Sequence, residues 1–254
     1  MTMTERPEPG DAERRTEKTP DRVARRVLRE IRERKMGAGD RLPNEVSMAQ
    51  EFGVGRASVR EAMRILETHG LVQIKPGPRG GPVVRQANGV DFGRSMSMFF
   101  SHSGVTYREV IEARLAFEPM QARLAAERLT DEAAQLLQDT TEQGWRSLDA
   151  PDEVWTDSSR VFHQVIAKIS DNRALELWLG GLLAVEASYI AHSVKREFRP
   201  YTLHDHDRIA AAVIARDGAA AERLSAEHMR SIVHEIERAY SDEMGHVIDW
   251  LNLD

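Results

Sequence analysis

Three histidines on separate amphipathic segments are the residues of this chain best suited to metal chemistry. His163, His206 and His228 each lie in a segment with helical periodicity, and such helices can pack together as a bundle. Metal sites in bundles form from side chains that face inward. Three imidazoles with an open coordination position suit a divalent zinc, nickel or manganese ion. Spacing alone leaves a second interpretation open, in which each histidine is structural.

Two arginines and a serine offer a different chemistry, the reading of DNA. Arg56 and Arg60 lie one helical turn apart and share a face, and Ser58 lies between them. Arginine can grip guanine or clamp a phosphate, and a serine hydroxyl can donate to a phosphate. Arg79 stands at the tip of a Gly/Pro-rich hairpin, within reach of the minor groove or backbone. A merely solvated side chain is the alternative for each, but their joint order favours DNA binding.

Three helices and a hairpin must position these arginines. We predict helices from Thr19 (as N-cap, with Pro20 following), over 45–52 and over 56–69, with Gly53 ending the second. Strands at 71–75 and 83–85 then flank a loop too rich in proline and glycine for anything but a hairpin turn. This order is typical of a winged helix-turn-helix.

The remainder of the chain has only helical periodicity. We predict seven helices, at 91–102, 106–129, 130–148, 152–170, 172–194, 203–216 and 217–240. Three of these helices begin at a residue expected to cap them: Thr130, Asp152 and Asp217. The fold class is therefore mainly α, with an N-terminal winged helix-turn-helix domain and a C-terminal all-α bundle of seven helices.

The predicted domain boundaries follow from these elements. We expect a disordered tail (1–18), a DNA-binding domain (19–86), a linker (87–90), an effector-binding and dimerisation domain (91–240) and a C-terminal tail (241–254).

Composition limits the function further. The 254 residues carry a net charge of −6, but residues 1–85 hold 18 Lys/Arg against 13 Asp/Glu, a net of +5 on an otherwise acidic chain. A basic front on an acidic body fits a nucleic-acid-binding module joined to another domain. The absence of cysteine excludes disulfides, zinc ribbons and thiol nucleophiles. Without an apolar run of about 18 residues we expect no membrane span and a cytoplasmic location.

The N-terminal motifs resemble those of the GntR family of bacterial transcription regulators. The resemblance covers roughly residues 20–85 and rests on three runs, at 39–45, 52–67 and 70–72. It implies that four positions contact operator DNA: Arg56, Ser58, Arg60 and the wing glycine Gly77. Two positions depart from the pattern. Val46 replaces an arginine that reads a base in many members, and Gly55 replaces the usual Ser/Thr N-cap.

The helical body resembles the FCD ligand-binding domain of the FadR-like subfamily, over roughly residues 90–240. Its landmarks are Glu112-Ala113-Arg114 with Glu118, Phe162-His163, Asp171-Asn172, His206 with Ile209 and Asp217, and His228. In metal-binding members an aspartate and three histidines ligate the ion. The resemblance implies that His163, His206 and His228 are ligands here, with His204 as a less favoured substitute for His206. Ser159 stands at the aspartate position, so we expect weaker metal binding.

Arg114 has two possible roles under this resemblance. Its planar guanidinium could grip an effector carboxylate near the metal, or it could form a structural ion pair with Glu118 one turn away.

These observations predict a homodimeric regulator, with repression favoured over activation. It would bind a roughly palindromic operator in double-stranded DNA and respond to a small organic acid sensed in the helical domain. Two alternatives remain at this stage. One is a metal-dependent hydrolase that uses the three histidines, although no carboxylate base is placed beside His163. The other is a DNA-binding dimer that responds to no effector.

Overall fold

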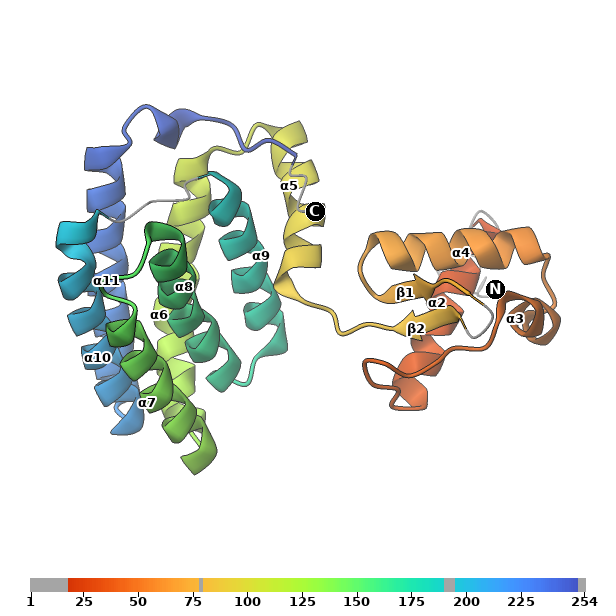
Figure 1. Cartoon of the computed structure of the whole chain (residues 1–254), viewed down its shortest axis with the longest axis horizontal. Coiled ribbons are helices and arrows are strands. Elements are labelled where there is room, and N and C mark those ends of the chain that lie inside the picture. Colours follow the sequence, from red (N-terminus) through yellow and green to blue (C-terminus); the bar gives the residue numbers. More distant parts are fainter. Residues whose placement is uncertain (1–17, 78–79, 190–194, 251–254) are drawn as a thin grey trace, which may run out of the picture. The chain divides into compact units, whose positions relative to one another are not determined.

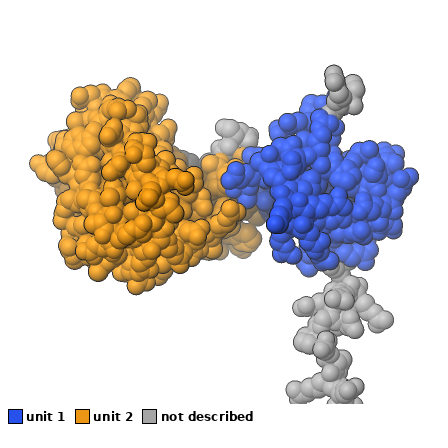
Figure 2. Space-filling view, turned by 90° about the horizontal axis from the view of Figure 1, so that it is seen from below, with its two compact units in different colours: residues 1–87 blue, residues 88–254 orange. Residues whose placement is uncertain are grey.

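The computed structural model describes residues 18–77, 80–189 and 195–250. The chain divides into two compact units, Met1–Ala87 and Asn88–Asp254 (Figure 2). Each unit has its own hydrophobic core and is described by itself.

The N-terminal unit is the predicted winged helix-turn-helix (Figure 1). Its elements are α2 (Thr19–Glu33), α3 (Glu45–Phe52), α4 (Arg56–Thr68), β1 (Val72–Lys75) and β2 (Gly81–Val84). The apolar face of α4, with Val59 and Met63 fully buried, packs against Val23 and Val27 of α2. This face sets which side of α4 is left for solvent and therefore for DNA.

Two local details of this unit differ from the sequence predictions. Thr19 is not the N-cap of α2: Lys18 occupies that position without a side-chain hydrogen bond, and Thr19 is already helical. Strand β2 begins two residues before the predicted start, because Gly81 and Pro82 pair with Lys75 and Ile74. The predicted end of α3 is correct, since Gly53 adopts the left-handed conformation (φ 65°).

The C-terminal unit contains the predicted seven α-helices within the described residues (Figure 1). They are α5 (Gly89–Ser103), α6 (Tyr107–Arg128), α7 (Asp131–Arg146), α8 (Asp152–Ile169), α9 (Arg173–Tyr189), α10 (Arg199–Ile214) and α11 (Gly218–Ala239). Two short 3-10 helices accompany them, η1 (Arg196–Phe198) and η2 (Glu243–Gly245). The predicted continuation of α9 over 190–194 lies outside the described residues.

Helix ends in this unit follow local hydrogen bonds that the sequence only partly reveals. Thr130 and Asp217 are N-caps as predicted, but Asp152 is the first helical residue of α8, after Pro151. Helix α5 starts inside the stretch assigned to a linker, because the Asn88 side chain accepts from the backbone of Asp91 and caps it.

The core of this unit surrounds α6, which packs against α8, α9, α10 and α11. Small side chains allow this central position, because Ala122, Ala125 and Ala126 are fully buried. Residues 241–250, which we assigned to a tail, bring Met244 and Ile248 into a second cluster of buried side chains.

None of the helices in the described part of the chain is long and apolar enough to cross a membrane.

Candidate metal and effector site and the DNA-binding surface

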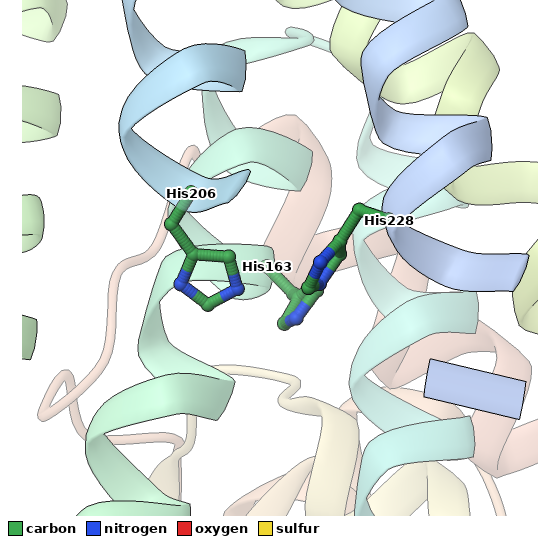
Figure 3. Close-up of side chains that lie close together, drawn as sticks. All are labelled: His163, His206 and His228. Carbon is green, nitrogen blue, oxygen red and sulfur yellow. The ribbon is translucent and has the colours of Figure 1, made fainter. Parts of the chain in front are cut away.

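Three helices each contribute one histidine to a buried cluster. His163 comes from α8, His206 from α10 and His228 from α11 (Figure 3). One nitrogen of each ring lies within 4.8 Å of a nitrogen of the others, and all three side chains are buried. The tight connection between α10 and α11 makes the meeting of His206 and His228 possible. The structure therefore brings together the three histidines that the sequence singled out.

His204 does not join this cluster. Its ring packs edge-on against Trp145 of α7, with centroids 5.0 Å apart. His206, two residues later and on another face of α10, stacks on Phe162 with centroids 4.0 Å apart and an interplanar angle of 10°. The structure thus favours His206 over His204 as the candidate ligand.

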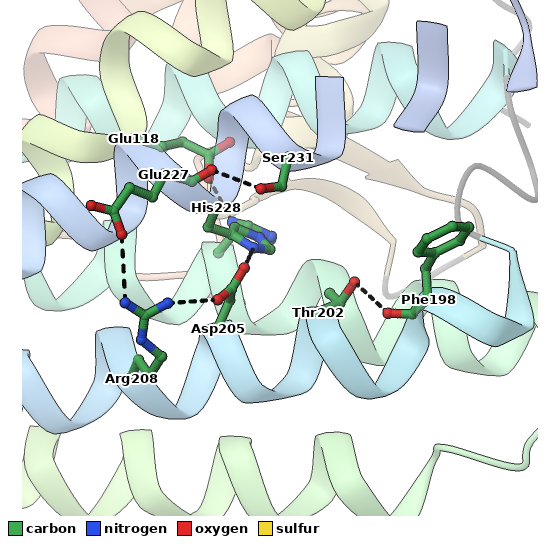
Figure 4. A network of polar contacts seen from close by, with 9 residues as sticks. Glu118, Phe198, Thr202, Asp205, Arg208, Glu227, His228 and Ser231 are labelled. Atoms are coloured by element: carbon green, nitrogen blue, oxygen red, sulfur yellow. Dashed lines mark hydrogen bonds and ion pairs between the residues drawn. The ribbon is translucent and has the colours of Figure 1, made fainter. Parts of the chain in front are cut away.

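A carboxylate outside the cluster orients the His163 ring, and a second carboxylate lies near the His228 ring. His163 Nδ1 lies 2.5 Å from Glu118 Oε2, a hydrogen bond in which only the ring nitrogen can donate once the carboxylate is ionised. This places the proton on Nδ1 and leaves the Nε2 lone pair for a ligand. His228 Nδ1 lies 3.4 Å from Asp205, without hydrogen-bond geometry, and Arg208 connects Asp205 to Glu227 (Figure 4).

Burial favours the neutral form of two of the three histidines, His206 and His228. Burial, together with the neighbouring His228, His163 and Arg114, holds the pKa of His206 well below its usual value. Burial also lowers the pKa of His228, although Asp205 opposes the shift. His206 Nε2 and both ring nitrogens of His228 have no hydrogen-bond partner among the described residues. Unpaired buried nitrogens in the ligating protonation state fit a divalent ion.

Arg114 is held by two carboxylates in the interior of the unit. Its Nε donates to Glu118 Oε1 at 2.7 Å, and its Nη1 pairs with Glu186 of α9. Burial alone would raise the pKa of Glu118, but Arg114 and His163 outweigh it and lower that pKa to about 2. The structural ion pair weighed from the sequence is therefore present. Arg114 also lines a cavity beside the histidines. The structure is therefore also compatible with the other role considered for Arg114, binding an effector carboxylate.

This cavity has a volume of about 40 Å³, enough for roughly two or three water molecules or the head of one small ligand. Its lining residues come from five helices and include Arg114, Trp155, Ser159, Arg160, His163 and Glu186. Ser159 is therefore close to the histidines, where a metal-binding aspartate is expected, but it supplies no negative charge. Trp155 and Arg160 were not identified from the sequence, because an apolar ring and a surface-type charge on one helix give no signal of a shared cavity.

The DNA-binding candidates lie on the first turns of α4. Arg56 and Arg60 are exposed, and Ser58 is half-buried. Arg60 pairs with Glu45 at the start of α3, with Nη2 and Oε2 3.1 Å apart. Gly77 has φ +99°, a conformation that glycine adopts without strain. Arg79 lies outside the described residues.

A groove of about 420 Å³ adjoins these arginines. Arg56, the start of α3 and the hairpin residues Ile74 and Pro82 line it. Val46, at the position where the resemblance to the GntR family implies a base-reading arginine, also lines this groove and is 43% exposed. The N-terminus of α3, where the Asn44 side chain accepts from the backbone N–H of Ser47, and Arg56 contribute positive charge to the groove, and Glu45 contributes a negative charge.

A winged helix with exposed arginines, joined to an all-helical domain with a buried ligand-type cavity, defines a class: DNA-binding transcription regulators with a sensory domain. Comparison with known proteins narrows this class. Residues 19–80 match the model of bacterial regulatory proteins of the gntR family, and residues 109–231 match the FCD domain. The chain belongs to the GntR family and carries an FCD domain.

Individual relatives agree with this assignment. The chain is 32% identical over 222 residues to the HTH-type transcriptional repressor NanR of Escherichia coli K12. The matched region covers 85% of this chain and 83% of that protein. NanR of Citrobacter rodentium is also 32% identical, over 85% and 84% of the two chains. A solved GntR structure from Streptococcus agalactiae is similar with a TM-score of 0.67 and 26% identity, over 85% of this chain and 99% of that one.

Proposed function

We propose that this regulator is a homodimeric repressor that leaves its operator when a small organic acid binds beside the three histidines. The observation that carries the proposal is the buried cluster of His163, His206 and His228 next to a cavity whose lining includes two arginines and one glutamate. Such a site suits a small anionic ligand. The name of the NanR relatives favours repression over activation.

The same site is proposed to hold a divalent zinc, nickel or manganese ion. The fit rests on three clustered imidazoles, on the unpaired buried nitrogens of His206 and His228, and on Glu118, which accepts a hydrogen bond from His163. When bound, the ion would supply Lewis-acid attraction for a carboxylate oxygen. Ser159 adds no carboxylate to this set, so we expect the ion to be held less firmly than by an aspartate and three histidines.

Operator binding is assigned to Arg56, Ser58, Arg60, Gly77 and Arg79 of each protomer. Two winged helices related by a two-fold axis read a palindrome, with half-sites separated by about one helical turn or a multiple of it. Phosphate contacts by the arginines would make the affinity strongly dependent on salt.

The test is a footprint on the DNA that flanks the protein's own gene, with and without a panel of small carboxylic acids. We expect two protected half-sites, and release by one member of the panel. Sedimentation of the protein–DNA complex checks for two protomers. His206→Ala should keep operator binding but lose both zinc uptake, measured by elemental analysis, and release by the acid. His246→Ala, an exposed histidine of the same unit, is the matched control. Equal zinc uptake and equal release in His206→Ala and wild type would overturn the proposal.

A further inference from the structure

The cavity beside the histidines contains two nitrogen donors without acceptors. Arg160 Nη2 and Trp155 Nε1 are both buried, and neither has a hydrogen-bond partner in the described part of the chain. Trp155 is only 2% exposed, so its N–H cannot be satisfied by bulk solvent. Buried donors of this kind are costly unless an acceptor is bound. Because both residues line one cavity, the two donors are suited to a ligand that brings acceptor oxygens in place of water.

Helix α8 places these donors beside the histidine cluster. Trp155, Ser159 and His163 follow one another at intervals of four residues and share a face, and Arg160 lies one turn before His163. All four line the cavity. Arg160 Nη1 lies 3.4 Å from Asp157, but that carboxylate is 80% exposed and forms only a weak surface ion pair. The second terminal nitrogen of Arg160, Nη2, is buried without a hydrogen-bond partner among the described residues and is therefore the nitrogen left for a ligand.

The other charges at the cavity do not compete for this nitrogen. Glu186 lines the cavity too, but Arg114 Nη1 pairs with it and the Tyr107 hydroxyl lies 3.5 Å from its second oxygen. Glu118 is shared between Arg114 and His163. With Arg160 included, the two buried carboxylates are balanced by two guanidinium groups. Position 159 adds no negative charge, and both buried carboxylates already have partners, so neither one faces an anion in the cavity unpaired.

We propose that Arg160 and Trp155 form an oxyanion subsite that binds a carboxylate group of the effector directly, with or without a metal ion on the histidines. The planar guanidinium edge matches a carboxylate, and the indole N–H adds a third donor. The small cavity admits a flat carboxylate head more readily than a tetrahedral phosphate. This inference rests on the proposed function, since it names the group of the organic acid that the site recognises.

The experiment uses the full-length protein, both stripped of metal with EDTA and loaded with zinc. Acetate, glycolate and oxalate are titrated by calorimetry and by tryptophan fluorescence, with acetamide as the neutral counterpart and inorganic phosphate as the tetrahedral one. We expect the stripped protein to bind at least one of the three carboxylates, and to bind acetamide and phosphate at least about tenfold more weakly. In Trp155→Phe the fluorescence response should disappear, because the reporting indole is removed.

Variants of Arg160 give the decisive comparison. Arg160→Gln should lower carboxylate affinity at least about tenfold, while Arg160→Lys should recover part of it because the charge returns without the planar fork. Lys168→Gln, which removes a positive charge from an exposed site on the same helix, should have no effect. Asp157→Asn should leave affinity unchanged or increase it. Circular dichroism melts verify that each variant is folded.

The outcomes separate this inference from the proposed function. If Arg160→Gln binds the carboxylates as well as wild type, if only zinc-loaded protein binds them, or if acetamide or phosphate binds equally well, the oxyanion subsite is refuted. Operator release by an organic acid would stand in each of those cases. If neither stripped nor zinc-loaded protein binds any carboxylate, and no acid releases the operator, the proposed function is refuted as well.

Discussion

Glu118→Gln should weaken zinc binding at the histidine cluster about 10- to 100-fold, although Glu118 is not itself a candidate ligand. The two oxygens of Glu118 have different partners: Oε1 accepts from Arg114 Nε and Oε2 from His163 Nδ1. Glutamine has one oxygen only. If that oxygen stays with Arg114, the amide NH₂ faces His163 Nδ1, which must then act as an acceptor. The proton moves to Nε2, the nitrogen that would bind the ion.

The same substitution has a separate effect on stability. Arg114 would lose one of its two ionised partners inside the protein, and hydrogen bonds to charged groups contribute about 1.5–3 kcal/mol each. Because glutamine retains the shape and one acceptor, we expect the metal-free variant to lose about 1–2 kcal/mol, near the lower end of that range. Chemical denaturation of the stripped protein measures this loss independently of zinc.

Zinc affinity is best measured by competition with a chromophoric chelator at pH 7.5, where Glu118 is ionised. The control is Glu227→Gln, which removes a carboxylate at the outer end of the chain of contacts from His228 through Asp205 and Arg208. That variant should bind zinc within about twofold of wild type, since it leaves His163 untouched. If Glu118→Gln is folded and binds zinc as tightly as wild type, Glu118 does not set the tautomer of His163, and the reasoning fails.

Three further predictions concern other parts of the chain. Arg60→Ala should cost about 1–3 kcal/mol of operator affinity per half-site in fluorescence anisotropy, whereas Glu45→Gln, which frees Arg60 from its ion pair, should not weaken binding. Gly180→Ala should lower stability by about 1–3 kcal/mol in thermal melts, because the added Cβ would lie 2.8 Å from the Cα of Gly89. Metal-free protein should lose stability as the pH falls below about 6.5, because His206 binds a proton in the unfolded chain but resists it when buried.

Each of these predictions has a matched control. His69, exposed at the end of α4, can be replaced by glutamine without changing the pH dependence, whereas His206→Gln should flatten it. Gly245→Ala meets no atom within 4 Å and should be neutral. Equal pH profiles for the two histidine variants, a neutral Gly180→Ala, or operator binding unchanged in Arg60→Ala would each contradict the corresponding argument.

The sequence was sufficient to predict the helices and the winged helix-turn-helix where apolar periodicity and the local turn and capping residues agree. Seven helices and a winged helix-turn-helix followed from apolar spacing, glycine stops and the hairpin loop, and the structure has all of them. The convergence of His163, His206 and His228 was predicted from the resemblance to the FCD domain, and the short connection between α10 and α11 favours the antiparallel arrangement that lets His206 and His228 meet. Thr19 and Asp152 failed as caps because the preceding residue already adopts the extended conformation of an N-cap.

The details that matter for ligand recognition depend on packing between distant segments. Arg160 and Asp157 look like an ordinary surface pair on one helix, and only the approach of α9, α10 and α11 shows that one edge of Arg160 is buried. Likewise, Glu118 was visible from the sequence only as a neighbour of Arg114. Its contact with His163 joins residues 45 apart in the chain, a separation at which sequence spacing carries no information.

The position of Glu186 links the ligand cavity to the start of the helical unit. Glu186 lies on α9 and pairs with Arg114 at the cavity. Two turns earlier on the same helix, Gly180 meets Gly89 of α5 with no room for even a methyl group. Helix α5 starts immediately after the boundary at Ala87, so it is the first element that follows the DNA-binding unit. A displacement of α9 at Glu186 would therefore reach α5, because close-packed backbones transmit a displacement rather than absorb it.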